Sequence, residues 1–163
     1  MKLIHLSDLH IGKRVNEFSM AEDQKYILNQ ILEIIDREQP DCVVIAGDVY
    51  DKSIPSAEAV QILDDFLTRL AGRKIPAAMI SGNHDSPERL SFGAQLMKES
   101  GIYVSPVYVG QVQSIGFADE YGEVRVYLLP FLKPATGRHV YEEETVESYQ
   151  DAVETAISHL PFN

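Results

Sequence analysis

Three short polar blocks follow directly after three apolar runs, and this arrangement constrains the fold more than any other feature of the chain. The blocks are SDLHIG at 7–12, AGDVYD at 46–51 and SGNHDS at 81–86. The runs before them, KLIHL, CVVIA and AAMI, are continuous enough in apolar residues to predict buried parallel strands. Because ligands bind where the carboxyl ends of such strands meet, the three blocks are predicted to converge at one edge of a sheet.

Helical patterns separate these strands. Helices are predicted over 21–38, 56–71 and 87–100, with Ser19 as the N-cap of the first and Pro55 and Ser56 opening the second. The apolar face predicted for the first helix contains Tyr26, Ile27, Ile31, Ile34 and Ile35. The buried stripe predicted for the second contains Val60, Leu63, Phe66, Leu67 and Leu70. This alternation of strands and helices predicts a layered α/β fold, in which helices flank a mainly parallel core sheet.

The pattern changes after Gly101. The segments there predict short strands at 102–104, 111–117 and 124–129, a turn at 120–122, a loop over 131–141 and a final helix over 146–160. The length of 163 residues, 45% of them apolar, suits one globular domain.

Composition also bounds the setting of the protein. Cys42 is the only cysteine, which rules out an intrachain disulfide, favours a cytoplasmic location and predicts a buried strand residue. The N-terminal residues MKLIHLSDLH are predicted to form the first strand and not a signal peptide, and no run in these residues is long enough to predict a membrane span. The net charge of −11 argues against a generally basic nucleic-acid surface. Part of the negative charge, however, gathers at the predicted strand ends, where cations would reverse the local potential.

The polar blocks carry the residues of a metal site. Asp8 and His10 are alternate residues, so in an extended segment both would face one ion. Asp48 follows the second strand, and Asn83 and His84 follow the third. Taken singly, the first two blocks are also typical of turns or helix caps, whereas the third is more informative because it places an amide, an imidazole and a carboxylate on one turn. Taken together, carboxylates, imidazole and amide form the mixed oxygen and nitrogen set that divalent metals use in phosphate ester chemistry.

The three patterns D-x-H, G-D and G-N-H-D resemble the first signature blocks of the calcineurin-like metallophosphoesterases. The fuller strings HLSDLHIGK, AGDVYD and SGNHDSPERL are similar to one branch of that family, the bacterial SbcD nucleases. The string YLLPFLKP at 127–134 also resembles that branch, so the similarity extends over nearly the whole chain.

The resemblance implies a role for each residue of the blocks. Asp8 and His10 would bind a first metal ion, Asp48 would bridge two ions, and Asn83 would bind the second. His84 would face the substrate and donate a proton or a hydrogen bond to the phosphoryl group or the leaving oxygen. Two ions about 3.5–4 Å apart can activate water and stabilise an in-line displacement. The mixed ligands favour Mn²⁺, with Mg²⁺ as the alternative.

The chain departs from the family pattern in one respect. Members of the family complete the site with three later histidines, in blocks that are not found in these 163 residues. The remaining histidines are interpreted differently: His5 as a core or hydrogen-bonded residue, and His139 and His159 as surface residues. Residues 1–163 are therefore interpreted as the N-terminal part of a nuclease domain, without the rest of that domain, the capping domain and the ATPase-binding segment. Such a fragment is expected to bind metal weakly and to cleave DNA slowly or not at all.

The partners expected from the resemblance are DNA, an SbcC-like ATPase subunit and a second copy of the chain. The cations that could position phosphates around the site are Lys13, Arg14, Lys52 and Arg89. A homodimer would form through the helices predicted at 56–71 and 87–100, where core packing is the other explanation for Phe92, Leu96 and Met97. The expected activity is metal-dependent exonuclease or endonuclease cleavage in DNA repair, recombination and replication.

Two further functions compete with the nuclease. The three blocks alone are also compatible with a metallophosphatase or phosphodiesterase that acts on small phosphoesters, whereas the longer strings favour the nuclease. Loss of the metals would instead leave a non-catalytic scaffold that keeps the dimer and partner contacts.

Overall fold

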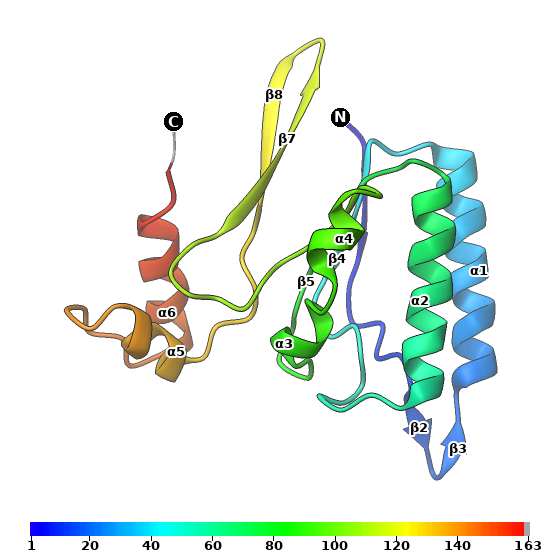
Figure 1. Ribbon diagram of the computed structural model, residues 1–163, viewed down its shortest axis with the longest axis horizontal. Helices are drawn as coiled ribbons and strands as arrows, with labels where there is room; N and C mark the ends of the chain where they lie inside the picture. The colour runs from blue at the N-terminus through cyan, green and yellow to red at the C-terminus, as the bar shows by residue number, and fades with distance from the viewer. Residues whose placement is uncertain (162–163) are drawn as a thin grey trace.

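A four-stranded parallel sheet lies at the centre of the protein (Figure 1). The computed structural model describes residues 1–161. The strands are arranged in the order β1 (Leu3–Leu6), β4 (Cys42–Ala46), β5 (Ala77–Ile80) and β6 (Ile102–Val104). The first three are neighbours and run in parallel, so the polar blocks that follow them leave the sheet at the same edge. The predicted α/β architecture and the convergence of the blocks are confirmed.

Two long helices, α1 (Ala21–Glu38) and α2 (Ala57–Gly72), lie side by side and pack on one face of the sheet (Figure 1). The predicted range of α1 is confirmed, and two members of its predicted apolar face are correct, because Ile35 is buried and Ile31 packs against the core. The other three members are wrong. Tyr26 is 63% exposed, and Ile27 and Ile34 are also exposed. The buried side chains of this helix are Ala21, Leu28, Leu32 and Ile35. Leu28, Leu32 and Ile35 have the spacing of one helical stripe, whereas the predicted set mixed two adjoining stripes.

The start of α2 agrees with the prediction, because the Ser56 side chain caps the helix by accepting from the Ala59 N–H at 3.1 Å. Val60 was wrongly placed in the buried stripe, and it is exposed while Ile62 is buried. The predicted cap of α1 is also wrong. Ser19 instead belongs to a small antiparallel pair of strands, β2 (Arg14–Val15) and β3 (Phe18–Ser19), and Met20 occupies the N-cap position.

The helix predicted over 87–100 is divided into α3 (Pro87–Leu90) and α4 (Ala94–Lys98). Gly93 interrupts it with a φ of +75°, a left-handed conformation that glycine adopts without steric cost. The division leaves Phe92 and Leu96 strongly exposed, while Met97 packs against the core.

The remaining elements cover the other face of the sheet and extend away from it. The strands β7 (Gln113–Asp119) and β8 (Gly122–Leu128) form a hairpin, and Ile115 and Leu128 pack with Cys42 from β4. The helices α5 (Pro134–Val140) and α6 (Tyr149–Ser158) pack against each other in a separate apolar cluster (Figure 1). The loop predicted over 131–141 is therefore wrong, because Pro134 starts a helix there.

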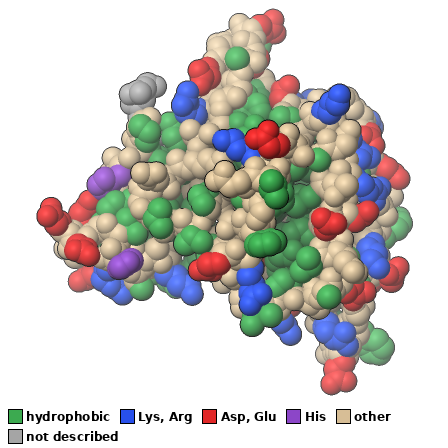
Figure 2. Space-filling view, viewed as in Figure 1, with side chains coloured by type: hydrophobic (Ala, Val, Ile, Leu, Met, Phe, Trp, Pro, Cys, Tyr) green, Lys and Arg blue, Asp and Glu red, His purple; other side chains and the backbone are tan. Residues whose placement is uncertain are grey.

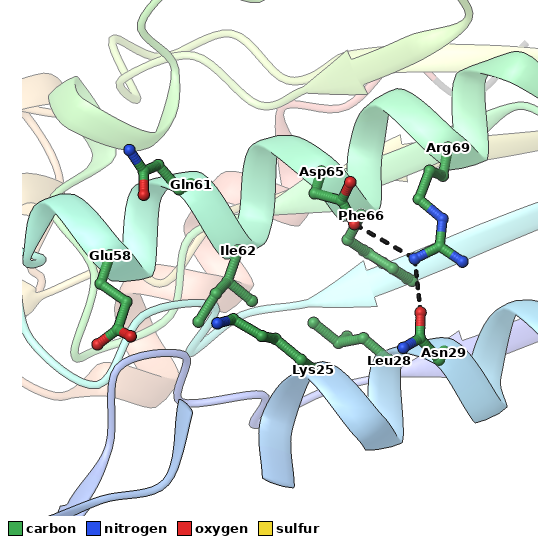
Figure 3. A pocket seen from close by; sticks show the side chains of 9 residues that line it. All are labelled: Lys25, Leu28, Asn29, Glu58, Gln61, Ile62, Asp65, Phe66 and Arg69. Carbon is green, nitrogen blue, oxygen red and sulfur yellow. Dashed lines mark hydrogen bonds and ion pairs between the residues drawn. The ribbon is translucent and has the colours of Figure 1, made fainter. Parts of the chain in front are cut away.

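A cavity of about 290 Å³ lies between α1 and α2 (Figure 3). Leu28, Ile62 and Phe66 line its apolar part, and charged and amide side chains form its rim. Arg69 joins the two helices there, since it donates to Asn29 at 2.5 Å and to Asp65 at 3.2 Å. Across residues 1–161, every helix is too short or too polar to cross a membrane.

Candidate metal centre

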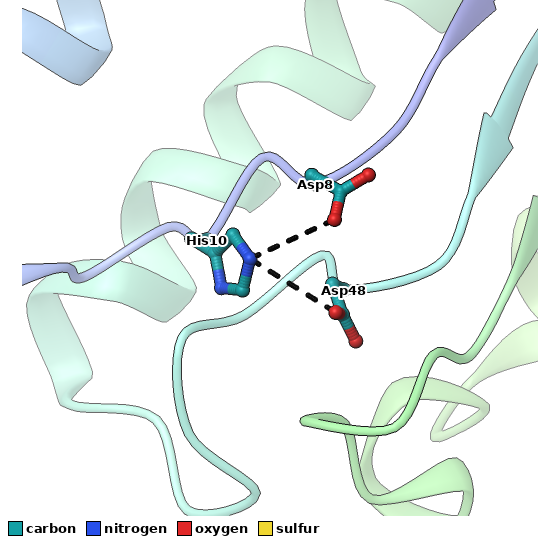
Figure 4. Close-up of side chains that lie close together, drawn as sticks. All are labelled: Asp8, His10 and Asp48. Atoms are coloured by element: carbon teal, nitrogen blue, oxygen red, sulfur yellow. Dashed lines mark ion pairs between the residues drawn. The ribbon is translucent and has the colours of Figure 1, made fainter.

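The loops after β1 and β4 bring two carboxylates and an imidazole together (Figure 4). The Nε2 atom of His10 lies 3.9 Å from an oxygen of Asp8 and 3.9 Å from an oxygen of Asp48. One donor atom from each of the three side chains lies within 4.8 Å of the other two. Donor atoms at this spacing can surround a single cation.

These three residues share an unusual backbone conformation. The φ angles are +55° at Asp8, +43° at His10 and +48° at Asp48, all in the left-handed region. Aspartate and histidine occur there more often than most residues, although the conformation is strained. The reasoning from an extended Asp-x-His segment was therefore wrong, although its expectation that both side chains face one point is correct.

Backbone hydrogen bonds fix the first two loops against each other. The Asp8 N–H donates to the Gly47 carbonyl at 3.1 Å, and the His10 N–H donates to the Asp48 carbonyl at 2.9 Å. These bonds continue the pairing of β1 and β4 beyond the regular strands. As a result, Asp8, His10 and Asp48 keep their register with one another.

The loop after β5, called the third loop below, joins the site through Asp48. One carboxylate oxygen of Asp48 accepts from the His84 N–H at 2.9 Å, while the other faces His10. Asn83 is exposed and lines a cavity of about 390 Å³ together with Asp8 and Asp48. Residues 129–132 also line this cavity.

The ring of His84 is held by one of its nitrogens. Nδ1 lies 3.0 Å from the carbonyl oxygen of Asp51, and the ring packs edge-on against His10 with centroids 4.9 Å apart. Because a carbonyl only accepts, Nδ1 must carry the hydrogen. Nε2 is therefore the nitrogen that can exchange a proton with a ligand.

Asp85 also contributes to the site, although no role was predicted for it from the sequence. It is 7% exposed, and its carboxylate accepts from three backbone N–H groups. The donors are Val49 at 3.1 Å, Tyr50 at 2.9 Å and Gly82 at 2.8 Å. The buried carboxylate thus connects the second and third loops. Short acidic side chains often stabilise turns by accepting backbone N–H groups in this way.

Two glycines allow these loops to touch. Gly47 has a φ of +84°, and a Cβ placed on it would lie 2.9 Å from the Cα of Gly82. A Cβ on Gly82 would in turn lie 2.8 Å from Cγ of Asp48 and closer still to other atoms of that residue. A side chain on Gly47 would clash with the backbone of the third loop, and one on Gly82 would clash with Asp48.

The donor set fits a divalent cation. Nδ1 of His10 is buried without a hydrogen-bond partner within residues 1–161, and its nearest acidic neighbour is a carboxylate oxygen of Asp51 at 3.4 Å. The same oxygen lies 3.9 Å from the Lys13 ammonium group. Asp8 and Asp48 both lie on the Nε2 side of this ring, and a cation bound between the three donor atoms would relieve the repulsion between the two carboxylates.

The four predicted phosphate-positioning cations are spread around this site. Lys13 lies beside Asp51, whereas Arg14 is turned toward the Glu17 carbonyl oxygen. Arg14 and Lys52 line a cavity of about 480 Å³ that also contains Asp51. Arg89 is exposed on α3.

The remaining histidines and the cysteine can be placed as well. His5 is exposed on β1, so its predicted core role is wrong. His139 and His159 are exposed as predicted, and His159 stacks on Tyr141 with centroids 4.6 Å apart. Cys42 is fully buried as predicted, and burial raises the pKa of its thiol to about 11, which excludes it as a nucleophile at neutral pH.

Comparison with known proteins shows similarity to a phosphoesterase family and to a nuclease subunit. A family model described as "Calcineurin-like phosphoesterase" matches residues 1–163. The chain is also 37% identical over 161 residues to the SbcD subunit of the nuclease SbcCD of Staphylococcus epidermidis. That match covers 98% of this chain and 42% of the relative, so the chain spans about two fifths of the length of the curated relative it matches.

Proposed function

The chain belongs to the calcineurin-like phosphoesterase family, and from this premise we propose that it is the metal-binding part of a nuclease that hydrolyses phosphodiester bonds in DNA. Phosphoesterases of this kind are metal-dependent hydrolases. The observation that carries the proposal is the convergence of Asp8, His10 and Asp48 at the end of the sheet. A similar relative named as a nuclease supports DNA as the substrate.

Each side chain would bind one or both of two metal ions. Asp8 and His10 would hold one ion, Asn83 would hold the other, and Asp48 would contact both. The support for a bridging role is that the two oxygens of Asp48 are turned to different sides, one toward His10 and one toward the third loop. When bound, the ions would supply an activated water and positive charge for the displacement at phosphorus. The mixed donors favour Mn²⁺, with Mg²⁺ as the alternative.

His84 would act on the substrate directly. Its Nδ1 hydrogen is committed to the Asp51 carbonyl, so Nε2 would give a proton or a hydrogen bond to the phosphoryl group or the leaving oxygen. The exposure of the residue gives a substrate access to that nitrogen. Lys13, Arg14, Lys52 and Arg89 would position the flanking phosphates.

The first test compares His84→Gln with the matched control His139→Gln, which changes an exposed histidine outside the site. In an intact-length protein, we expect His84→Gln to lower Mn²⁺-dependent hydrolysis of a phosphodiester about a hundredfold, because it removes the proton donor. Mn²⁺ affinity measured by titration calorimetry should stay within about twofold of the unmodified chain, because His84 is not a ligand. Equal activity of the two variants would contradict the role given to His84.

The rate of the unmodified chain is itself part of the proposal. Four donor side chains leave most coordination positions of two ions to water, so we propose that these residues alone bind metal weakly and turn over slowly. Rapid Mn²⁺-dependent turnover by the chain would overturn this. Rates on duplex DNA ends and on a small chromogenic phosphodiester should be compared in an intact-length protein, since a preference for the small ester would favour the phosphodiesterase alternative.

We also propose that the nuclease works as a homodimer and together with an SbcC-like ATPase in DNA end processing during repair, recombination and replication. The name of the relative identifies that protein as one subunit of a nuclease. Figure 2 shows hydrophobic side chains gathered near the middle of one face, over the region of α3 and α4. Phe92 is 85% exposed there and Leu96 is 79% exposed, so core packing does not account for them.

The dimer can be tested by placing charges in this patch. We expect the double variant Phe92→Glu and Leu96→Glu to sediment as a monomer at concentrations at which the unmodified chain is a dimer, because two carboxylates would be desolvated at the interface. Tyr121→Glu is the matched control, since Tyr121 is equally exposed at the tip of the β7–β8 hairpin. If the double variant still forms a dimer, the interface does not include Phe92 and Leu96.

A further inference from the structure

The first metal-binding loop is held by a side chain that lies outside the three polar blocks. Gln24 is in the first turns of α1, and its amide contacts the backbone of residues 9–12. Its nitrogen donates to the His10 carbonyl at 2.7 Å and to the Leu9 carbonyl at 3.2 Å. Its oxygen accepts from the Gly12 N–H at 2.9 Å.

The pattern of these bonds requires an amide. The Leu9 and His10 carbonyls accept and the Gly12 N–H donates, and a glutamine side chain supplies the complementary donor and acceptor from one planar group. The His10 carbonyl also accepts from the Lys13 N–H at 3.0 Å. Glutamate would present oxygens to both carbonyls, and an apolar side chain would satisfy none of the three groups. The orientation of the amide is therefore set by its partners.

The loop is confined on its other side as well. A Cβ on Gly12, which has a φ of +89°, would lie 2.8 Å from the Cβ of Ala59 on α2. Gly12 is therefore confined by Gln24 of α1 and by Ala59 of α2. His10 lies in the same loop and has the strained φ of +43°. Strained conformations persist where the surroundings over-determine them.

We propose that Gln24 is a positioning residue for the metal site, because it fixes the backbone of His10 so that Nε2 faces Asp8 and Asp48. This inference rests on the proposed metal-dependent function. The His10 N–H still donates to the Asp48 carbonyl at 2.9 Å, so without the amide we expect His10 to stay paired with the second loop while its ring shifts away from the two carboxylates. A purely structural glutamine would affect the stability of the chain and leave its metal affinity unchanged.

The test compares Gln24→Met with Gln30→Met in the same helix, where Gln30 donates to the side chain of Glu33 at 3.3 Å. Mn²⁺ affinity is measured by titration calorimetry, and the midpoint of thermal unfolding is measured in EDTA. We expect Gln24→Met to lower Mn²⁺ affinity at least tenfold, as loss of a ligand-orienting contact does elsewhere. The Gln30→Met variant should bind Mn²⁺ as the unmodified chain does. Equal affinity of the two variants would overturn the inference.

A second measurement needs no metal and keeps the two proposals separate. In the metal-free chain, the Gln24→Met substitution should speed hydrogen exchange of the Gly12 amide about tenfold and shift the ring signals of His10, while those of His139 stay unchanged. If the unmodified chain binds no Mn²⁺, the metal-dependent function fails and these signals alone decide the role of Gln24. Unchanged Gly12 exchange and unchanged His10 signals would overturn it.

Discussion

Replacing Gly82 with alanine is expected to lower the free energy of unfolding by about 4 kcal/mol and to abolish Mn²⁺ binding. The added Cβ would lie 2.8 Å from Cγ of Asp48 and would overlap other atoms of that residue. Neither side can move easily, because one is a backbone turn and the other is a carboxylate that accepts from the His84 N–H. The second and third loops would have to separate. Chemical denaturation and Mn²⁺ titration calorimetry would measure the two effects.

Gly72→Ala is the matched control for this substitution. Gly72 is the last residue of α2, and a Cβ there has no atom within 4 Å. The same chemical change should therefore be neutral or stabilise the chain by about 0.4–1 kcal/mol, because alanine restricts the unfolded state. A Gly82→Ala variant as stable as Gly72→Ala, with Mn²⁺ affinity intact, would show that the second and third loops do not touch at Gly82.

The general placement of the site could be predicted from the sequence because it depends on strand order and little else. Once β1, β4 and β5 are parallel neighbours, the blocks after them must leave the sheet at one edge. Asp8, Asp48 and Asn83 accordingly line one cavity although they are far apart in the chain. Apolar runs that end in polar residues can be recognised from neighbouring residues alone, so a single sequence is enough to predict them.

The means by which the loops are held could not be predicted, because each depends on contacts across the fold. The left-handed conformation of His10 has no local marker, and Gln24 looks like any other polar residue on an amphipathic helix. The predictions of which apolar side chains are buried on α1, and of one continuous helix over 87–100, were wrong for the same reason. Apolar periodicity indicates which residues share a stripe, but tertiary packing decides which stripe is covered.

The three loops are therefore joined by bonds to the backbone more than by bonds between ligand side chains. Gln24 holds the first loop, Asp85 joins the second to the third, and Gly47 and Gly82 let those two touch. Side chains that bind backbone groups can fix the positions of ligands without competing for the metal. Changes at these residues should consequently alter metal affinity as well as stability.

Asp85→Asn is expected to produce the second large loss, about 3 kcal/mol in the free energy of unfolding. The carboxylate accepts from the N–H groups of Val49, Tyr50 and Gly82, and hydrogen bonds to a charged group contribute about 1.5–3 kcal/mol each. Asparagine has nearly the same shape but presents an NH₂ group where one of these donors points. At least one buried N–H would then face another donor and lose its partner.

The same substitution should weaken metal binding, because Val49 and Gly82 adjoin Asp48 and Asn83 in the chain. We expect Mn²⁺ affinity to fall about tenfold, measured at a temperature at which the variant is still folded. Asp65→Asn is the matched control, since Asp65 is an exposed residue of α2 that pairs with Arg69 at 3.2 Å. It should cost less than about 1 kcal/mol and leave Mn²⁺ affinity unchanged, because exposed ion pairs contribute little. Similar stabilities of the two variants would mean that the buried carboxylate does not hold the loops together.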